Sequence, residues 1–221
     1  MDKHESFKHL IEWIIFLPVR LKRRSASRFH YRIRSQAIES VRRALHGFSN
    51  LKADSHRVVY NVALYLLLLD QDLSDFTDDL INSIGEHRRK YLAKYEATLL
   101  YEAAEDLPHL LGRDFRNAVK MLGASEEQQL CLNAASSDLN HFGQSEKEFL
   151  GKIRNALAAH REQNALAYIE ALDQVIPLHV MRRAADLSAH LNRLSNVITE
   201  IAQRSTGTSS LIHDMLETNK Q

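Results

Sequence analysis

The sequence predicts an all-α protein, and three observations support this fold class. The chain has only 7 Gly and 3 Pro in 221 residues, which is too little turn chemistry for a β-sandwich or a β-barrel. Apolar residues recur at helical spacing along much of the chain, and residues that cap helices stand where several of these segments begin. We therefore expect an antiparallel bundle of about seven or eight helices with an amphipathic and basic N-terminal extension.

The N-terminal extension is expected to contain two helices. The first has one apolar stripe, formed by residues at helical spacing: Phe7, Leu10, Ile11, Ile14 and Ile15. Pro18 is expected to end this helix, because proline lacks an amide proton. A second helix is expected over residues 25–46, since Gly47 and Asn50 indicate a turn. Residues 1–50 are therefore expected to form the extension.

The bundle is expected to start with a buried helix over residues 51–69, where apolar residues leave little room for a polar face. Five aspartates follow: Asp70, Asp72, Asp75, Asp78 and Asp79. Several are placed to cap the next helix and to complement its dipole. That helix is expected to reach about Asp106, with an interruption at Gly85. Pro108 is then expected to start another helix, which ends near Gly123.

Two capping boxes predict further helix starts. Ser125 precedes Gln128 by three positions, and Ser145 precedes Glu148 by the same spacing. In a capping box the hydroxyl reaches forward to a backbone amide, and the third residue reaches back to the amide of the first. We therefore expect one helix to begin at each serine.

The last long helix is expected to begin near Pro177 and to end at about Arg204. A segment rich in Ser, Thr and Gly follows it. The expected helical bundle then covers residues 51–205, and residues 206–221 are expected to form a C-terminal tail.

Composition restricts the compartment and the partners. Lys+Arg 29 and Asp+Glu 28 give a formal net charge of +1, so overall charge does not indicate a polyanionic partner. The single cysteine, Cys131, excludes a disulfide framework and fits a cytoplasmic location. It stands between two leucines and is expected to be buried. The apolar runs over 13–19 and 62–69 are far shorter than the roughly 20 residues of a membrane span.

Local positive charge is concentrated near the N-terminus. This basic cluster contains seven residues and no acid: Arg20, Lys22, Arg23, Arg24, Arg28, Arg32 and Arg34. It could follow an RNA backbone while Phe29 and Tyr31 stack on unpaired bases. It could equally pair with the aspartates of residues 70–79 or with a neighbouring subunit. Together with the apolar stripe, residues 5–24 could instead lie on an anionic membrane surface.

One segment has Arg154, Asn155 and His160 in the pattern of a family motif, and that resemblance implies RNA chemistry for them. The common phosphate-loop, zinc-protease and serine-hydrolase signatures are absent from the sequence. A histidine can take the 2′-hydroxyl proton of RNA, or return a proton to the leaving 5′-oxygen, at neutral pH. An arginine can hold two phosphate oxygens as negative charge builds up, and Asn155 would orient either group. On a helix, positions 154 and 160 are about 9 Å and roughly 120° apart, so they would flank a groove.

This segment resembles the signature of the HEPN family, an all-helical superfamily that includes many metal-independent ribonucleases. The family motif is an Arg, usually followed by Asn, Asp or His, and then a His after four to six residues. Arg154, Asn155 and His160 match it with five residues between Arg and His. The looser Arg–His spacing also occurs elsewhere, as at Arg183 with His190, but only Arg154 has the second element of the motif.

The resemblance implies an endoribonuclease that needs neither a metal nor another cofactor. It also implies a homodimer, in which two copies of Arg154 and His160 share one cleft, with Arg161 adding to the RNA contact. The family includes toxins and antiviral-defence effectors, so an inhibitory antitoxin is a possible partner. Some of these toxins have a Tyr two residues after the His, where this chain has Glu162, which argues against control by nucleotide attachment to that position.

The alternative belongs to a different class of protein. The chain could be a non-catalytic helical interaction or nucleic-acid-binding protein that works through the basic cluster. Glu102, Glu105 and His109 could in principle form a metal site, because their i, i+3, i+7 spacing can place them on one helix face. Pro108 interrupts this set and no second ligand group matches it, so we interpret these residues as surface charges.

Overall fold

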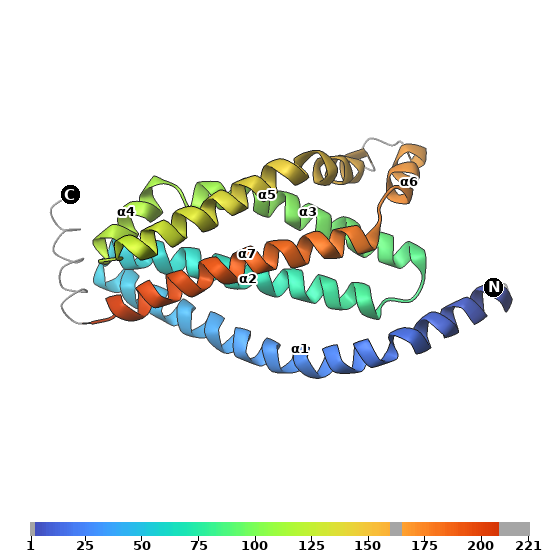
Figure 1. Ribbon diagram of the computed structural model, residues 1–221, viewed down its shortest axis with the longest axis horizontal. Coiled ribbons are helices and arrows are strands. Elements are labelled where there is room, and N and C mark those ends of the chain that lie inside the picture. The colour runs from blue at the N-terminus through green and yellow to red at the C-terminus, as the bar shows by residue number, and fades with distance from the viewer. Residues whose placement is uncertain (1–2, 160–164, 208–221) are drawn as a thin grey trace.

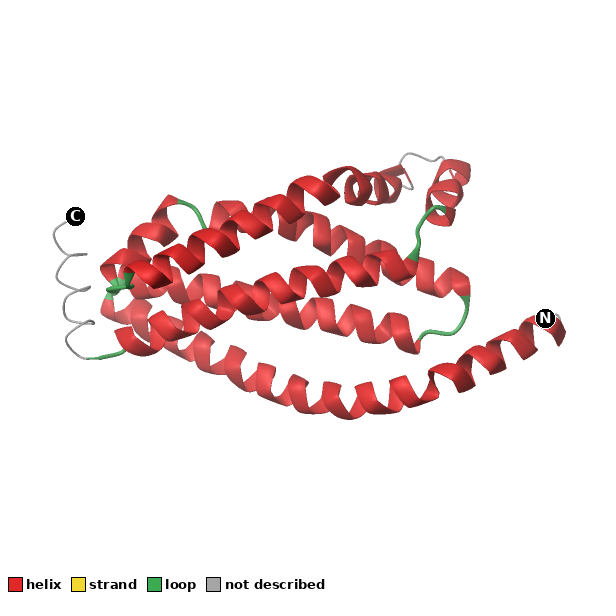
Figure 2. Ribbon diagram, viewed as in Figure 1, coloured by secondary structure: helices red, strands yellow, loops and turns green. Residues whose placement is uncertain are grey.

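The computed structural model describes residues 3–159 and 165–207. These ranges contain helices and no strand, which confirms the predicted all-α class. The helices are α1 (Lys3–Leu51), α2 (Asp54–Asn82), α3 (Glu86–Leu110), α4 (Arg113–Met121), α5 (Glu126–Ala159), α6 (Ala165–Asp173) and α7 (Pro177–Ser205). Figure 1 shows an elongated molecule in which the long helices lie lengthwise, and Figure 2 shows the loops that join them.

The core is formed by helices whose buried residues recur every three or four positions. In α7 these residues are Val180, Ala184, Leu187, Leu191, Leu194, Ile198 and Ile201. In α2 they include Val59, Val62, Leu66, Leu69 and Leu73. This spacing gives each helix one continuous apolar face, which favours lengthwise packing. Accordingly, α2 packs on α7, and α3 contacts α2, α5 and α7.

Two glycines bring α5 close to α3. A Cβ at Gly143 would lie 3.4 Å from the backbone oxygen of Ala104, and a Cβ at Gly151 would lie 3.5 Å from Cε2 of Tyr101. Both distances are ordinary van der Waals separations, so α5 and α3 are in direct contact at these two positions. This close packing determines which α3 residues lie beside the C-terminal part of α5.

The predicted break at Pro18 is wrong, because α1 continues through this residue from Lys3 to Leu51. Proline removes one helical hydrogen bond and usually bends a helix, but it does not have to end one. No glycine or capping serine stands next to Pro18 to supply a turn. The predicted turn at Gly47 and Asn50 falls close to the actual end of α1, which then packs along α2.

The prediction that the aspartates cap a new helix is also wrong. All five lie inside α2, which ends at Asn82. Asp70 is instead bound by Arg34, with 2.8 Å between Nη2 and Oδ2. Burial raises the pKa of Asp75, and the charges of Asp72 and Asp78 raise it further. The aspartates therefore form an acidic stretch of a helix against which α1 packs.

The interruption predicted at Gly85 is confirmed. This glycine has a φ of 95° in the loop between α2 and α3, a conformation that side chains with a Cβ disfavour. The predicted helix start at Pro108 is wrong, because this residue lies in the last turn of α3 and α4 begins at Arg113. The predicted start of the last helix at Pro177 is confirmed.

The two capping boxes have different outcomes. The Ser125 box is formed: Ser125 N donates to Gln128 Oε1 at 3.1 Å, and Gln128 N donates to Ser125 Oγ at 3.2 Å. The Ser145 prediction is wrong, because α5 runs unbroken past this position. Ser145 Oγ donates instead to the backbone oxygen of Phe142 at 3.0 Å. Only the first box marks a helix start.

Replacing Ser125 by Ala is therefore expected to lower the free energy of unfolding by about 1 kcal/mol, because one backbone amide at the helix start loses its partner. Ser145→Ala is the matched control. It should be neutral or slightly stabilising, because it replaces a serine that bonds back within a helix by a better helix former. Urea denaturation of both variants measures the difference. Equal losses would contradict this assignment of the two serines.

A buried lysine attaches α6 to α3. Lys94 is only 3% exposed. Its Nζ donates to the hydroxyl of Tyr168 at 3.0 Å and lies 4.3 Å from the centroid of that ring. Near the other end of α6, Lys90 Nζ lies 3.1 Å from Asp173 Oδ1. These contacts hold the short α6 against the first half of α3.

Candidate functional site

The described part of the HEPN-like motif lies in the last two turns of α5. Leu150 and Ile153 are buried in the core, whereas Arg154 and Asn155 are exposed. The polar pair therefore begins on the outward side of a helix whose other face packs on the protein. His160 and Arg161 lie outside the described residues.

The side chain of Arg154 lies over an aromatic ring of α3. Its Cζ is 5.1 Å from the centroid of Tyr101, and the small Gly151 lets this ring approach α5. A guanidinium carries five N–H donors in a planar fork, and a cation–π contact does not use them up as an ion pair would. No ion pair joins Arg154 to a carboxylate of the described residues. Its N–H groups can therefore bind an anionic oxygen.

Neighbouring lysines compensate the acidic residues on this part of α5. Lys152 Nζ lies 2.7 Å from Glu148 Oε1 and lowers the pKa of that carboxyl group through a hydrogen bond and its charge. Lys147 Nζ lies 3.2 Å from Glu105 Oε1 of α3, and the hydrogen bond to Glu105 raises the lysine pKa. These pairs reduce the negative potential that Arg154 would otherwise experience.

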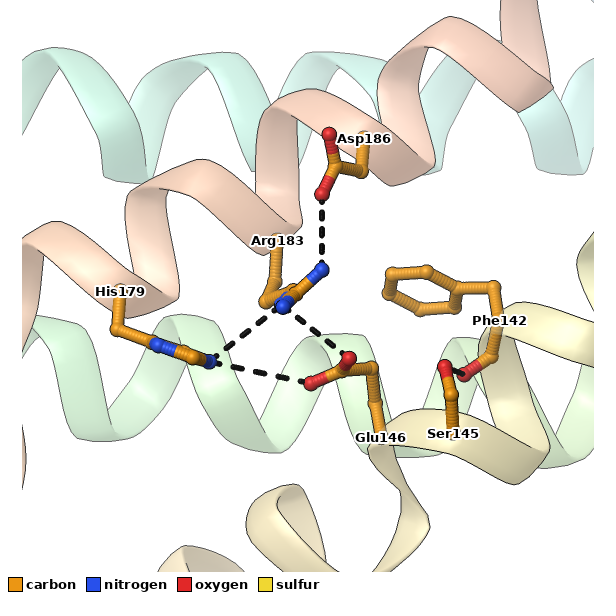
Figure 3. Close-up of polar contacts among 6 residues, drawn as sticks. All are labelled: Phe142, Ser145, Glu146, His179, Arg183 and Asp186. Atoms are coloured by element: carbon orange, nitrogen blue, oxygen red, sulfur yellow. Dashed lines mark hydrogen bonds and ion pairs between the residues drawn. The ribbon is translucent and has the colours of Figure 1, made fainter.

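A second polar cluster, which sequence reasoning missed, joins α5 to α7 (Figure 3). Its centre is Glu146, whose side chain is only 8% exposed. Arg183 Nε lies 3.2 Å from Glu146 Oε1, and Arg183 Nη1 lies 3.1 Å from Asp186 Oδ2. His179 Nε2 lies 4.0 Å from Glu146 Oε2 and 3.4 Å from Arg183 Nε. We refer to these four residues as the Glu146 cluster.

One signal for the Glu146 cluster was present in the sequence. Glu146 occupies a position in the buried stripe of α5 that otherwise contains Leu139, Phe142, Leu150 and Ile153. A carboxylate at such a position needs a partner, because burying an unpaired charge is costly. The identity of that partner could not be read, since Arg183 belongs to another helix.

The Glu146 cluster distinguishes Arg154 from the looser motif match at Arg183. The guanidinium of Arg183 already contacts two carboxylates. The paired His190 lies 3.9 Å from Asp138 Oδ2, which also contacts Arg193 at 3.4 Å. Arg183 is therefore engaged within the protein and is better suited to joining helices than to binding phosphate, and Nδ1 of His190 is buried.

The basic cluster is described only in part. Arg32 is exposed, whereas Arg34 contacts Asp70 of α2. For one of the seven basic residues, this ion pair agrees with the interpretation in which the basic cluster pairs with the aspartates of α2. Phe29 and Tyr31 are exposed. The structure describes α1 as helical at the other five positions but gives no side-chain contacts for them: Arg20, Lys22, Arg23, Arg24 and Arg28.

Two further interpretations of the sequence concern a metal site near Glu105 and the burial of Cys131. Glu105 binds Lys147, and within the described ranges no group of three or more His, Cys, Asp or Glu residues could hold a metal ion. The expectation that Cys131 is buried is wrong, because it is exposed. The face of α5 that packs inward at this point carries Leu132 and Ala135 instead.

Comparisons with known proteins give no relative for this chain: no family model, curated protein or solved structure matches it. Within residues 3–159 and 165–207, no helix combines the length and the apolar character needed to cross a bilayer.

Proposed function

We propose that this protein is a metal-independent endoribonuclease of the HEPN type that acts as a homodimer. The observation that carries the proposal is the state of Arg154, which is exposed, lies 5.1 Å from the centroid of the Tyr101 ring and is unpaired with any described carboxylate. Asn155 is exposed beside it, and His160 completes the motif in the sequence. An arginine that is positioned by an aromatic ring and has no carboxylate partner can donate its N–H groups to a phosphodiester.

The proposed reaction is an internal transesterification. His160 of one subunit takes the proton of the 2′-hydroxyl group, and the 2′-oxygen attacks the adjacent phosphorus. Arg154 stabilises the negative charge on the non-bridging oxygens. The bond to the 5′-oxygen breaks, and this oxygen receives a proton from the second His160. The products carry a 2′,3′-cyclic phosphate and a 5′-hydroxyl group, and no metal takes part.

The proposal includes an arrangement of the helices and of the subunits. We infer that α2–α7 form an antiparallel bundle with the N-terminal part of α1 as an extension. The contacts of Gly143 with Ala104 and of Gly151 with Tyr101 support opposite directions for α3 and α5. A two-fold axis beside the end of α5 would place both copies of the motif in one cleft. A cytoplasmic toxin or defence effector, inhibited by a partner, is the proposed setting.

The test is RNA cleavage by the full chain in EDTA. The wild type is expected to produce fragments with 2′,3′-cyclic phosphate ends, and His160→Ala is expected to remove this activity without changing the helical content. His109→Ala is the control, because this histidine lies in the last turn of α3 and is not part of the motif. Equal cleavage by His160→Ala and the wild type would refute the proposed mechanism.

The alternative function predicts different results in binding and cleavage experiments. A non-catalytic nucleic-acid-binding protein would bind RNA without cutting it, and its affinity would fall steeply with salt. Binding would depend on the basic cluster and would be indifferent to His160. The engagement of Arg34 with Asp70 removes one of the charges on which this alternative depends.

A further inference from the structure

The N-terminal part of α1 extends beyond the rest of the protein. α1 has 49 residues and α2, along which it packs, has 29. The 20 additional residues add about 30 Å at 1.5 Å per residue. Figure 1 shows α1 running past the loop between α2 and α3, with its N-terminus away from the other helices. We call residues 3–22 the overhang.

The overhang and the residues that follow it combine apolar and basic character. The helical register places Phe7, Leu10, Ile11, Ile14 and Ile15 along one face. The only tryptophan of the chain, Trp13, lies in the same segment. Five members of the basic cluster follow within residues 20–28, and no acid occurs between Glu12 and Glu39. Helices of this composition lie in the interface of anionic membranes.

The same end of the molecule exposes apolar side chains from other elements. The loop after α2, the helix α6 and the start of α7 all lie at the end where α1 overhangs (Figure 1). Five large apolar side chains there are more than half exposed: Ile84, Leu166, Ile169, Ile176 and Leu178. A cavity of about 340 Å³ beside them is lined largely by Leu80, Ile81, Ile176, Pro177, Leu178 and Met181. An end of a molecule that exposes several large apolar side chains is a candidate interaction surface.

One lysine at this end outside α1 is already paired with acidic residues. Lys90 lies between two carboxylates, 3.0 Å from Glu86 Oε1 and 3.1 Å from Asp173 Oδ1. The basic cluster of α1 is the concentration of positive charge that would attract an anionic partner.

We propose that the overhang and the apolar end of the protein bind together to an anionic membrane surface. Apolar groups enter the interface, while the arginines and Lys22 contact lipid phosphates. RNA would match the positive charge but not the apolar stripe. A second copy would match the apolar stripe, but two basic overhangs would repel each other, and Asp70 is already occupied by Arg34. An anionic bilayer matches both the positive charge and the apolar stripe.

Trp13 gives a direct test with the full chain. Vesicles of phosphatidylcholine and phosphatidylglycerol in equal parts should shift the Trp13 emission to shorter wavelength and sediment the protein. Vesicles of phosphatidylcholine alone should do so far more weakly, and added salt should reduce the effect. Equal binding to both kinds of vesicle, or no shift with either, would overturn the proposal.

A pair of matched charge variants tests the role of the basic residues. Replacing Arg23 and Arg24 together by Gln should weaken binding to the anionic vesicles about 30-fold. Replacing Arg42 and Arg43 together by Gln is the control, since both are exposed on the same helix and contact Glu39 within the protein. Equal effects of the two pairs would contradict specific docking through the N-terminal part of α1.

A second pair tests the apolar end. Leu178→Glu, at a side chain that is 71% exposed, should weaken vesicle binding. Leu130→Glu, at a side chain that is 68% exposed in the first turns of α5, should leave it unchanged, because it lies at the other end of the molecule (Figure 1).

Two other partners, a second copy of the chain and RNA, would give different results in these experiments. Either of these results would refute the proposal. A second copy would shift the Trp13 emission without vesicles and in proportion to protein concentration. RNA as the partner would bind through Arg23 and Arg24 while vesicles did not. The proposal is independent of catalysis, because Arg154→Ala should bind vesicles as the wild type does.

Discussion

Replacing Arg154 by Ala is expected to lower kcat/KM for RNA cleavage by about 10²–10³-fold, the usual cost of removing a group that stabilises transition-state charge. The melting temperature should stay nearly unchanged, because the side chain is exposed and surface substitutions have small effects. Arg154→Lys should recover only part of the activity, since lysine keeps the charge but lacks the planar fork. Cleavage assays in EDTA and thermal melts measure both quantities.

The control for this prediction is Lys152→Ala. Lys152 is another exposed cation of the same helix, but it is bound to Glu148 at 2.7 Å. If the site requires only positive potential, both substitutions should reduce cleavage to a similar extent. If it requires the fork of Arg154, only the arginine variant should lose activity. Full cleavage by Arg154→Ala would exclude Arg154 from the reaction.

A capping box predicted a helix start correctly only where the chain also contains a signal that ends the preceding helix. The Ser125 box follows Gly123, whose φ of 77° ends the preceding segment, so amides at the start of α5 need a cap. The Ser145 box has the same spacing but lies within a helix, where the amides already have partners. Its hydroxyl therefore bonds back to Phe142. A capping box is informative only together with a signal that interrupts the helix before it.

An ion pair between two helices explains why the aspartates do not start the new helix that the sequence had predicted. From the sequence alone, a run of aspartates after a buried segment predicts a new helix start. In the structure, Asp70 is partnered by Arg34 from α1, so the acidic segment remains helical and packs on another element. This pairing could be named as an alternative from charge signs, but its position could not be derived without the packing of α1 on α2.

The sequence proposes the candidate site from residue type and spacing alone. The sequence selects Arg154 and Asn155 and links them with His160. It could not select Tyr101 as the ring beneath Arg154, because this contact depends on how closely Gly151 lets α3 approach. It could not identify the partners of Glu146 either, since these come from α7.

A large loss of stability is expected from a substitution in the Glu146 cluster. Glu146→Ala should lower the free energy of unfolding by about 2 kcal/mol, because it leaves Arg183 without its buried partner. The loss is smaller than for a fully buried pair, since the side chain of Arg183 is 30% exposed and keeps Asp186. For a chain of 221 residues, this corresponds to a melting temperature lower by about 4–8 °C.

The matched control is Glu148→Ala, which changes the same residue type two positions away in the same helix. The side chain of Glu148 is 84% exposed and pairs only with Lys152 among the described residues, so no measurable change in stability is expected. A double-mutant cycle with Arg183→Ala separates the ion pair from the lost packing volume, because only the pair produces a coupling energy between the two sites. A coupling near zero, or equal stabilities of the two glutamate variants, would show that Glu146 does not join α5 to α7 through its charge.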